Sequence, residues 1–375
     1  MSAAAPIVGI DPAHDQRFMQ LALTLGRRGL GRTWPNPAVG AVIVKDGVIL
    51  GRGWTQAGGR PHAETEALKR AGKAARGATM YVTLEPCSHH GKTPPCADAI
   101  VRAGIVRVVS SLDDPNPDVA GQGHTRLKER GVSVEVGLGA DEARRTHAGH
   151  FRRMREGRPQ VLLKLAVSAD GKAGAAGRKP VGVTGDDARL RVHMMRAEAD
   201  AILVGIGTAL SDDPVLTCRL PGMAGHSPVR VVLDTKLRIP LATALVSTAR
   251  ETPTWIFTTA APSALSEEII RSKGVEVFRV EGKDGRLDLA QIMKVLAERG
   301  ITRLMVEGGP TVASEFLKAD LVDEAALFRS PNVLGADAID ALEGLPLTAL
   351  TQSPRLKSLA TETVGRDTVE LYERV

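Results

Sequence analysis

Two short stretches decide how this chain folds: His62-Ala63-Glu64 and, about twenty residues later, Pro86-Cys87-Ser88-His89-His90-Gly91-Lys92-Thr93-Pro94-Pro95-Cys96. They supply one imidazole, from His62, and two thiols, from Cys87 and Cys96. This is the ligand set of a catalytic zinc site, because three protein ligands leave the fourth tetrahedral position for water. Glu64 can accept the proton that such a water must lose. We therefore predict a Zn²⁺ site with these three ligands and with Glu64 as the catalytic residue.

Two other interpretations of the same residues are open. His89 or His90 could add a fourth ligand and close the site into a structural zinc staple. The histidine and the two cysteines could also be unrelated buried side chains. The catalytic interpretation is favoured because Glu64 would have no role beside a closed metal site, and because His-x-Glu with Pro-Cys downstream is a specific pattern.

The composition is that of a globular protein of about two to three domains, given 375 residues at roughly 150 residues per domain. Only 3% of the residues are aromatic, so the cores must be aliphatic. The net charge of +6 suits a small phosphorylated substrate, although a solvated basic surface is the simpler explanation. The three cysteines do not have the pattern of a disulfide framework, since two of them lie in the ligand motif.

The sequence shows no targeting or membrane segment. Residues 1–6 lack the basic and then apolar regions of a signal peptide. No run of residues approaches the ~18 apolar positions of a membrane helix. We expect a cytoplasmic protein that does not enter a membrane.

The N-terminal half alternates helical and strand patterns. A helix is predicted over 15–31, with Asp15 as its N-cap. Strands are predicted over 39–44 and 48–54, with Asp46-Gly47 as the tight turn between them. The remaining predicted elements are helices that begin near His62 and at Cys96, strands over 79–84, 106–111 and 132–136, and a further helix before the last of these strands. This order implies a sheet covered by helices.

A polar, basic helix over 141–156 separates this half from the next and is predicted to pack little. After Gly157-Arg158-Pro159 the α/β pattern starts again, so we predict domains over 1–150 and 151–375. Strands of the second domain are predicted over 161–167, 201–205, 229–233, 254–258, 275–280 and 304–306, with helices over 185–197, 265–272 and 289–299.

Glycine-rich segments of the second half indicate a phosphate site. Val306-Glu307-Gly308-Gly309-Pro310-Thr311 places two glycines where a strand gives way to a helix, and free backbone N–H groups there can hold a phosphate. A simple tight turn is the competing interpretation. Val204-Gly205-Ile206-Gly207-Thr208 lacks the third glycine of a dinucleotide-binding fingerprint. The stretch from Gly207 to Arg219 is predicted to be a loop rich in hydrogen-bonding groups.

The metal motif resembles that of a known superfamily. His62-Ala63-Glu64 and Pro86-Cys87 are similar to the cytidine-deaminase superfamily, in which the two cysteines mostly lie closer together. The longer spacing here, with Asn36-Pro37-Ala38-Val39-Gly40 and Asp113-Asp114-Pro115-Asn116-Pro117, resembles the bifunctional deaminase/reductases of riboflavin biosynthesis. The resemblance spans essentially the whole chain.

For the N-terminal domain, the resemblance implies a cytidine-deaminase-like α/β/α sandwich with a mixed sheet. It would deaminate a phosphorylated pyrimidine, 2,5-diamino-6-(5-phosphoribosylamino)pyrimidin-4-one, and release ammonia. Matching positions would place Asn36, Lys92, Asp114 and Asn116 around this substrate. An amide can pair with a heterocycle edge, and a lysine offers a point charge to an anion. Without the resemblance, the Asn and Asp residues are equally well explained as turn residues beside prolines.

For the C-terminal domain, the resemblance implies a dihydrofolate-reductase-like α/β domain with a largely parallel sheet. This domain would use NADPH to reduce the ribosyl group to ribityl. Strand Lys164-Leu165-Ala166, Asp212-Asp213-Pro214 and the Glu307 segment carry this resemblance. The positions implied to contact the dinucleotide are Ala166, Thr208, Asp212, Thr235, Gly309, Pro310, Thr311, Val312, Ala313, Ser314 and Glu315. Those implied to hold the substrate are Lys164, Arg196, Leu216, Arg219 and Glu307. The two arginines suit its phosphate, and Lys164 could polarise the reacting group.

One segment departs from the resembled family. Where a Ser-x-aromatic run usually precedes Val183-Thr184-Gly185, this chain has Lys179-Pro180-Val181-Gly182. A glycine cannot stack on a nicotinamide as an aromatic ring can, so no cofactor contacts are assigned over 174–182. No motif independently distinguishes NADPH from NADH. We expect a homo-oligomer.

Two rival hypotheses remain open from the residues alone. A nucleic-acid-editing deaminase with a C-terminal RNA-binding domain is compatible with the charge of +6. With two Tyr and six Phe in the chain, however, no aromatic-rich strand is available for base stacking. The other hypothesis is a structural zinc unit joined to a binding module. We favour the enzyme, acting on a small molecule with no nucleic-acid partner.

Overall fold

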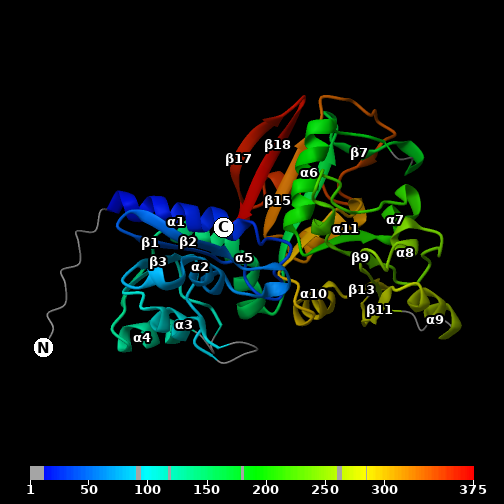
Figure 1. The fold of residues 1–375 in the computed structure, drawn as a ribbon. Helices are drawn as coiled ribbons and strands as arrows, with labels where there is room; N and C mark the ends of the chain where they lie inside the picture. The colour runs from blue at the N-terminus through cyan, green and yellow to red at the C-terminus, as the bar shows by residue number, and fades with distance from the viewer. Residues whose placement is uncertain (1–11, 90–93, 117–119, 179–180, 260–263, 284) are drawn as a thin grey trace, which may run out of the picture. The chain divides into compact units, whose positions relative to one another are not determined.

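The structure is a computed structural model that describes residues 12–89, 94–116, 120–178, 181–259, 264–283 and 285–375 (Figure 1). The chain forms two compact units that divide between Glu156 and Gly157. The boundary predicted after residue 150 falls inside helix α5 (Ala140–Glu156), which belongs to the first unit along its whole length. Each unit is built on its own sheet.

The first unit is built on a mixed sheet, as predicted. Its strands are β1 (Gly40–Lys45), β2 (Val48–Trp54), β3 (Thr79–Val82), β4 (Arg107–Ser110) and β5 (Ser133–Val136). The spatial order is β2-β1-β3-β4-β5, in which β1 pairs antiparallel with β2 and β3, and the remaining pairs are parallel. Asp46 and Gly47, both with positive φ, make the predicted tight turn between β1 and β2.

Helices cover both faces of this sheet, with α1 and α2 on opposite sides of it (Figure 1). Besides α5 they are α1 (Pro12–Arg27), α2 (Ala63–Ala71), α3 (Cys96–Ala103) and α4 (Gln122–Glu129). Phe18, Ala22 and Leu25 recur at helical spacing on α1 and are buried. α2 packs on β1 and β2, and α3 contacts both α2 and α4. The fully buried Ile43 and Met80 lie in the aliphatic core between these layers.

Asp15 does not cap α1, contrary to the prediction, because the helix begins at Pro12 and Asp15 lies in its first turn. Its buried carboxylate accepts hydrogen bonds from Arg107 (Nη2–Oδ2 2.6 Å, Nη1–Oδ1 3.0 Å) and from the Tyr81 hydroxyl (2.5 Å). The hydrogen bonds from Arg107 hold the pKa of Asp15 below its ordinary value. The contacts tie α1 to the neighbouring strands β3 and β4.

Helix α5 packs more closely than its polar sequence predicts. Thr146, His147 and His150 are buried in it, and Nε2 of His147 lies 3.1 Å from Oγ1 of Thr83. The prediction of little packing was wrong because buried polar side chains are tolerated where they find hydrogen-bond partners. Hydropathy along the sequence does not reveal those partners.

The second unit is built on a nine-stranded, largely parallel sheet in the part of the chain that the structure describes, which confirms the predicted fold class. Its strands are β6 (Gln160–Val167), β8 (Ala201–Gly205), β9 (Val229–Leu233), β10 (Thr254–Thr258), β11 (Glu276–Arg279), β14 (Arg303–Val306), β15 (Glu324–Arg329), β17 (Leu356–Val364) and β18 (Asp367–Arg374). The order is β11-β10-β9-β8-β14-β6-β15-β18-β17, and the pairs from β11 to β15 are all parallel. β18 and β17 extend the sheet antiparallel at one edge.

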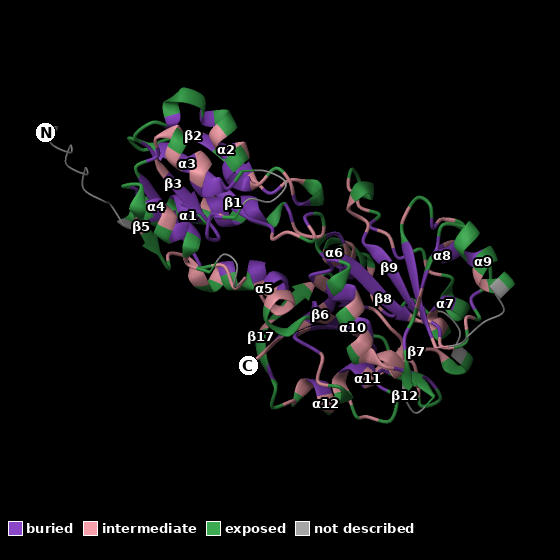
Figure 2. Cartoon of the chain, turned by 90° about the horizontal axis from the view of Figure 1, so that it is seen from below, coloured by how far each residue is buried: buried purple, intermediate pink, exposed green. Residues whose placement is uncertain are grey.

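Aliphatic strands form the centre of this sheet, where β8 and β9 are buried (Figure 2). Burial on both faces is typical of parallel strands, because crossover helices lie on each side. Among the described residues of this unit there are four further short strands, namely β7 (Lys172–Gly174), β12 (Gly282–Lys283), β13 (Arg286–Leu287) and β16 (Ile339–Asp340).

The helices of the second unit are α6 (Asp186–Glu198), α7 (Ile206–Asp212), α8 (Ala244–Ser247), α9 (Ala264–Ser272), α10 (Leu289–Glu298), α11 (Pro310–Lys318) and α12 (Thr348–Thr351). On α6, Ala188 and Val192 pack against Met305 and Phe328 of the sheet. The loop predicted from Gly207 onward begins instead as α7, whose buried Ala209 anchors it to the core. No helix in the described residues is long and apolar enough to cross a membrane.

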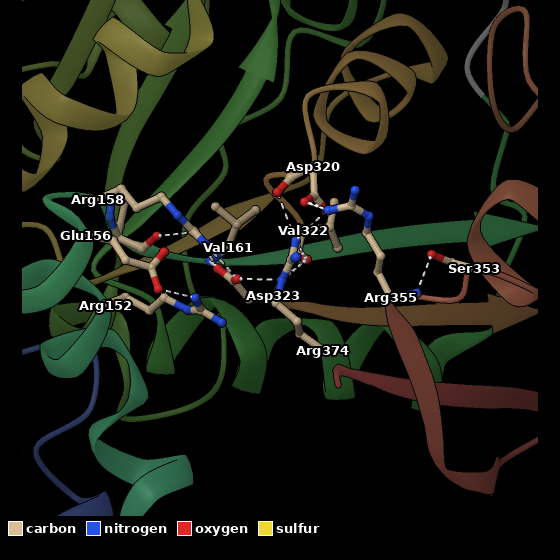
Figure 3. A network of polar contacts seen from close by, with 11 residues as sticks. Arg152, Glu156, Arg158, Val161, Asp320, Val322, Asp323, Ser353, Arg355 and Arg374 are labelled. Atoms are coloured by element: carbon tan, nitrogen blue, oxygen red, sulfur yellow. Dashed lines mark hydrogen bonds and ion pairs between the residues drawn. The ribbon is translucent and has the colours of Figure 1, made fainter.

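A polar network holds the start of β6 to β15 and β18 (Figure 3). The buried carboxylate of Asp323 accepts two hydrogen bonds from Arg158 (2.6 and 2.8 Å) and one from the Val161 backbone N–H (2.9 Å). Arg374 bonds to Asp323 (3.2 Å) and to Asp320 (2.9 Å). Because the buried charge of Asp323 is paired and hydrogen-bonded, its burial is tolerated. Its contacts fix the ends of three strands.

Candidate active sites

The first candidate site lies where two helices of the first unit begin. His62 precedes the first residue of α2, Cys96 is the first residue of α3, and Cys87 lies in the segment after β3. Nδ1 of His62 is 3.7 Å from Sγ of Cys87 and 3.4 Å from Sγ of Cys96. The three ligand atoms all lie within 4.8 Å of one another. The structure thus brings the three predicted ligands together.

This donor set fits a zinc ion. With Zn–S near 2.3 Å and Zn–N near 2.0 Å, a tetrahedral site separates nitrogen from sulfur by about 3.5 Å, which the two observed distances bracket. Sγ of Cys87 also accepts the backbone N–H of Cys96 at 3.3 Å. The pKa of Cys87 is lowered to about 4, first because the Cys96 thiol donates to it and then because His62 does. Cys87 is therefore poised as a thiolate, the form that binds metal.

Glu64 lies in the first turn of α2, two residues beyond the N-cap His62, and is only 3% exposed. Burial raises the pKa of its carboxyl group above the ordinary value. A carboxyl group with a raised pKa can both accept and release a proton near neutral pH, as a general acid–base catalyst must.

The alternative of a closed structural zinc site requires a fourth protein ligand. His89 is exposed and does not belong to the ligand cluster. His90, and the predicted substrate residue Lys92, lie outside the described residues. Within the part of the chain that is described, the His62 cluster has three protein ligands.

A second group of metal-type side chains, Glu85, Asp113 and His124, has a structural explanation. Both oxygens of the buried Glu85 carboxylate accept backbone N–H groups, at 2.8 Å from Gly123 and 2.9 Å from Gly121 among others. Nδ1 of His124 lies 2.9 Å from the Asp113 carboxylate. These contacts organise the chain around the start of α4, so a metal ion is not needed to explain the group.

Apart from Lys92, the predicted substrate residues lie in two described loops of the first unit. Nδ2 of Asn36 donates to the carbonyl of Gly59 at 2.8 Å, in the loop that leads to His62. Oδ1 of Asp114 accepts the backbone N–H of Asn116 (2.9 Å) and lies 3.1 Å from Nε2 of His150. The contact of His150 with Asp114 was not predicted from the sequence, because a histidine inside a basic helix gives no signal of its partner.

The second candidate site is a cavity of about 250 Å³ in the second unit. It lies at the carboxyl ends of β8 and β9 and beyond the end of β14, which are neighbours in the sheet. Ligands of open α/β sheets bind at such an edge. Its lining includes seven residues predicted to contact a dinucleotide, namely Thr208, Thr235, Gly309, Pro310, Thr311, Val312 and Glu315.

A smaller cavity of about 140 Å³ shares part of this lining, including Thr208 and Gly309, and adds Asp212. Ala166, Ala313 and Ser314 line neither of these two cavities. Ala313 and Ser314 are buried on the face of α11 turned toward the core. The alternation of faces along a helix explains why a continuous predicted stretch is only partly exposed to the cavity.

Gly309, in the glycine-rich turn, lines the larger cavity. A Cβ atom at this position would lie 3.2 Å from Oγ1 of Thr208 on α7, so a side chain here would crowd this part of the lining. The cavity also includes Arg286 and Leu287 of β13 and Leu289 of α10. None of these three was predicted: Arg286 and Leu287 come from a short strand without a recognisable motif, and Leu289 is the first residue of α10, where nothing in the sequence marks a lining position.

A largely buried charge cluster contains three of the predicted reductase substrate residues. Arg196 donates to both oxygens of Glu307 (Nε–Oε1 2.7 Å, Nη2–Oε2 2.8 Å) and to the carbonyl of Thr217 (3.3 Å). Burial alone would raise the pKa of Glu307, but the hydrogen bonds from Arg196 bring it below the ordinary value. Desolvation lowers the pKa of the nearby Lys164 ammonium.

The remaining predicted residues flank this cluster along the chain. Leu216 is buried with positive φ, and the backbone N–H of Arg219 donates to Nδ1 of His193 at 3.3 Å. His193 was not predicted. Charge interactions with Arg196, Arg219 and Glu307 place it among these residues, and desolvation is the main cause of its lowered pKa.

Known families match each unit separately. Residues 12–112 match the cytidine and deoxycytidylate deaminase zinc-binding region, which is the class that the His62, Cys87 and Cys96 cluster indicates. Residues 159–370 match the RibD C-terminal domain, which covers the sheet and the cavity of the second unit. The chain therefore joins a zinc-type deaminase to a reductase domain, and not to an RNA-binding domain.

Full-length relatives share this arrangement. The chain is 41% identical to the riboflavin biosynthesis protein RibD of Escherichia coli, over 94% of this chain and 97% of the relative. The structure of Acinetobacter baumannii RibD superposes with a TM-score of 0.86 at 35% identity, covering 97% of this chain and all of that one. The diaminohydroxyphosphoribosylaminopyrimidine deaminase/5-amino-6-(5-phosphoribosylamino)uracil reductase of Thermotoga maritima gives 0.84 at 35% identity, covering 97% and 99%. The chain belongs to the RibD family of bifunctional riboflavin-biosynthesis deaminase/reductases.

Proposed function

We propose that the first unit removes the exocyclic amine of 2,5-diamino-6-(5-phosphoribosylamino)pyrimidin-4-one, with zinc held by His62, Cys87 and Cys96. The observation that carries this proposal is the convergence of the three ligand atoms within 4.8 Å beside a buried glutamate. A zinc ion there would act as a Lewis acid toward water. The Thermotoga maritima relative, whose described activity is on this pyrimidine class, supports the choice of substrate.

In this proposal Glu64 moves the proton. Its carboxylate takes a proton from the attacking water and delivers it to the departing amine, which leaves as ammonia. Its raised pKa favours the protonated form that this second step requires. Asn36, Asp114 and Asn116 would bind the pyrimidine and the ribose phosphate, together with Lys92.

The second unit would bind NADPH in its cavity and reduce the ribosyl group to ribityl. The cofactor supplies the hydride, and the start of α11 offers backbone N–H groups to its phosphates. The proposed contacts are Ala166, Thr208, Asp212, Thr235 and residues 309–315. Arg196, Leu216, Arg219 and Glu307 would hold the ribosyl substrate, and Lys164 would polarise the reacting group. A cytoplasmic location and a homo-oligomeric state stay predictions of the sequence.

Separate assays of the two half-reactions test this function. Purified protein should release ammonia from the diaminopyrimidine nucleotide and should oxidise NADPH when given the deaminated nucleotide. Glu64→Gln should stop the first reaction only, and Glu307→Gln the second only. Loss of both reactions in either variant would contradict the assignment of separate sites.

A further inference from the structure

Eight residues separate Cys87 from Cys96, so the connecting segment does not by itself fix the distance between the two thiols. Two backbone contacts bring their segments together. The N–H of Cys96 donates to Sγ of Cys87 (3.3 Å), and the N–H of Ala97 donates to the carbonyl of Cys87 (3.2 Å). A third contact comes from a residue outside the metal motif, on helix α4.

Arg126 of α4 spans the two cysteine segments with one guanidinium group. Its Nη1 donates to the carbonyl of Ser88, the residue after Cys87, at 3.0 Å. Its Nη2 and Nε bind the two carboxylate oxygens of Asp98, in the first turn of α3, at 2.8 and 2.7 Å. The planar guanidinium fixes the direction of all three contacts. α3 and α4 pack against each other (Figure 1).

Helix α4 is itself held at the metal site. The Glu85 carboxylate, two residues before Cys87, accepts the backbone N–H groups of Gly123 and His124 at 2.8 and 3.2 Å. Gly123 lies so close to this segment that a Cβ atom would come within 2.0 Å of the Pro86 carbonyl oxygen. Arg126 therefore projects from a helix whose start is fixed to the segment that carries Cys87.

We propose that Arg126 is a positioning residue for the zinc site, which holds Cys87 and Cys96 at the separation that the metal requires. This inference rests on the proposed function, since it concerns the same ligands. The side chains of Arg126 and Asp98 are 33% and 25% exposed, and an ion pair so exposed adds little to stability. Metal affinity, in contrast, responds strongly to the groups that orient the ligands.

The test measures zinc affinity by competition with a chromogenic chelator. Arg126→Ala should raise the dissociation constant for zinc about 10- to 100-fold, as loss of a ligand-orienting group does. Asp98→Asn, which keeps the contact of Arg126 with Ser88, should raise it less. Arg144→Ala is the matched control, because Arg144 also pairs with an aspartate, Asp141, in the same unit.

Two further readouts separate positioning from a general loss of structure. The Co²⁺-loaded Arg126→Ala variant should show altered thiolate-to-cobalt absorption. Its rate of ammonia release should recover when zinc is supplied in excess. NADPH-dependent reduction of the deaminated nucleotide, which uses the second unit, should be unchanged and reports that the protein is folded.

Each outcome decides the inference. If Arg126→Ala and Arg144→Ala have equal dissociation constants for zinc, the inference about Arg126 is overturned. If His62→Ala nevertheless binds zinc more weakly than the wild-type protein, the proposed function is retained. If neither the wild-type protein nor His62→Ala binds zinc, the proposed function fails and the inference with it. If Arg126→Ala does not fold, the Asp98→Asn variant tests the inference instead. A raised dissociation constant for zinc in this variant supports the inference, and an unchanged one rejects it.

Discussion

The two units build their candidate sites by different means. In the first unit, side chains from three separate segments converge on one point, and the identity of each atom matters: one imidazole nitrogen, two sulfurs and a buried carboxylate. In the second unit, the cavity is formed where neighbouring parallel strands end, and its lining includes three glycines and residues at the starts of α7 and α11. The first site depends on chemistry at a few atoms, and the second on the shape of the sheet edge.

This difference predicts how each site responds to substitution. A single changed atom should abolish the first reaction without disturbing the fold. In the second unit, single substitutions should act by removing the partner of a charged side chain or by adding atoms to the lining of the cavity. Their effects on cofactor or substrate binding should be graded.

The largest expected effect is that of Glu64→Gln. It removes the proton carrier but keeps the volume, so ammonia release should fall about 10²–10⁴-fold, the usual contribution of a general acid–base group. Zinc content should be unchanged. Glu66→Gln is the matched control, because Glu66 lies on the same helix and pairs with Arg70. Comparable losses in the two variants would show that Glu64 has no special role.

Arg196→Ala should have the next largest effect, and this effect should fall on the NADPH-dependent reduction. The side chain of Glu307 is 9% exposed, and removing the arginine that donates two hydrogen bonds to it carries a penalty of about 3–5 kcal/mol, as breaking a buried ion pair does. NADPH oxidation should fall by about 10²-fold or more, while ammonia release is retained. Arg191→Ala on the same helix, where Arg191 is exposed and pairs with Glu362, should leave both rates near wild type.

Neighbouring glycines at the second site should have separable effects. A Cβ atom at Gly308 would meet Cβ of Val312 at 2.5 Å, so Gly308→Ala should lower the free energy of unfolding by about 1–3 kcal/mol, as overpacking does. At Gly309 the Cβ would meet only Oγ1 of Thr208, at 3.2 Å. Gly309→Ala should therefore raise KM for NADPH with little loss of stability. Equal stability losses in both variants would contradict the role of Gly309 in shaping the cavity.

The smallest expected effect concerns acid stability of the first unit. Because Arg107 depresses the pKa of Asp15, the contribution of this carboxylate is fully present above its unfolded pKa of about 3.9. It is lost as pH falls through the lower pKa of the folded state. The free energy of unfolding, measured with urea below about pH 5, should fall less steeply in Asp15→Asn. Asp141→Asn, at an exposed position, should follow the wild-type curve.

The same contrast explains what the sequence could predict. The metal ligands and Glu64 were recognisable because their types and spacing have few other uses, and the helix starts at His62 and Cys96 were found with them. The tight turn at Asp46-Gly47 was also predicted correctly from its residue types. In the second unit, the Gly308-Gly309 pair indicated a phosphate site, and Gly309 does line the cavity, but only the resemblance to a family supplied the other lining residues that were predicted.

What could not be predicted depends on tertiary contacts. Asp15 has the residue type of a helix cap, yet its partner Arg107 lies 92 positions away in the sequence. His150 and His193 gave no local signal, because their neighbours come from other elements. Arg286 lines the cavity from a two-residue strand that no periodicity could reveal. Arg126 would pass as an ordinary surface arginine.

Zinc removal tests the central claim most directly. Protein purified with one zinc per chain should lose ammonia release when a chelator strips the metal, and should regain it when zinc is restored. NADPH-dependent reduction should be unaffected throughout. Metal-free protein that still released ammonia at the full rate would contradict the account of the His62, Cys87 and Cys96 site.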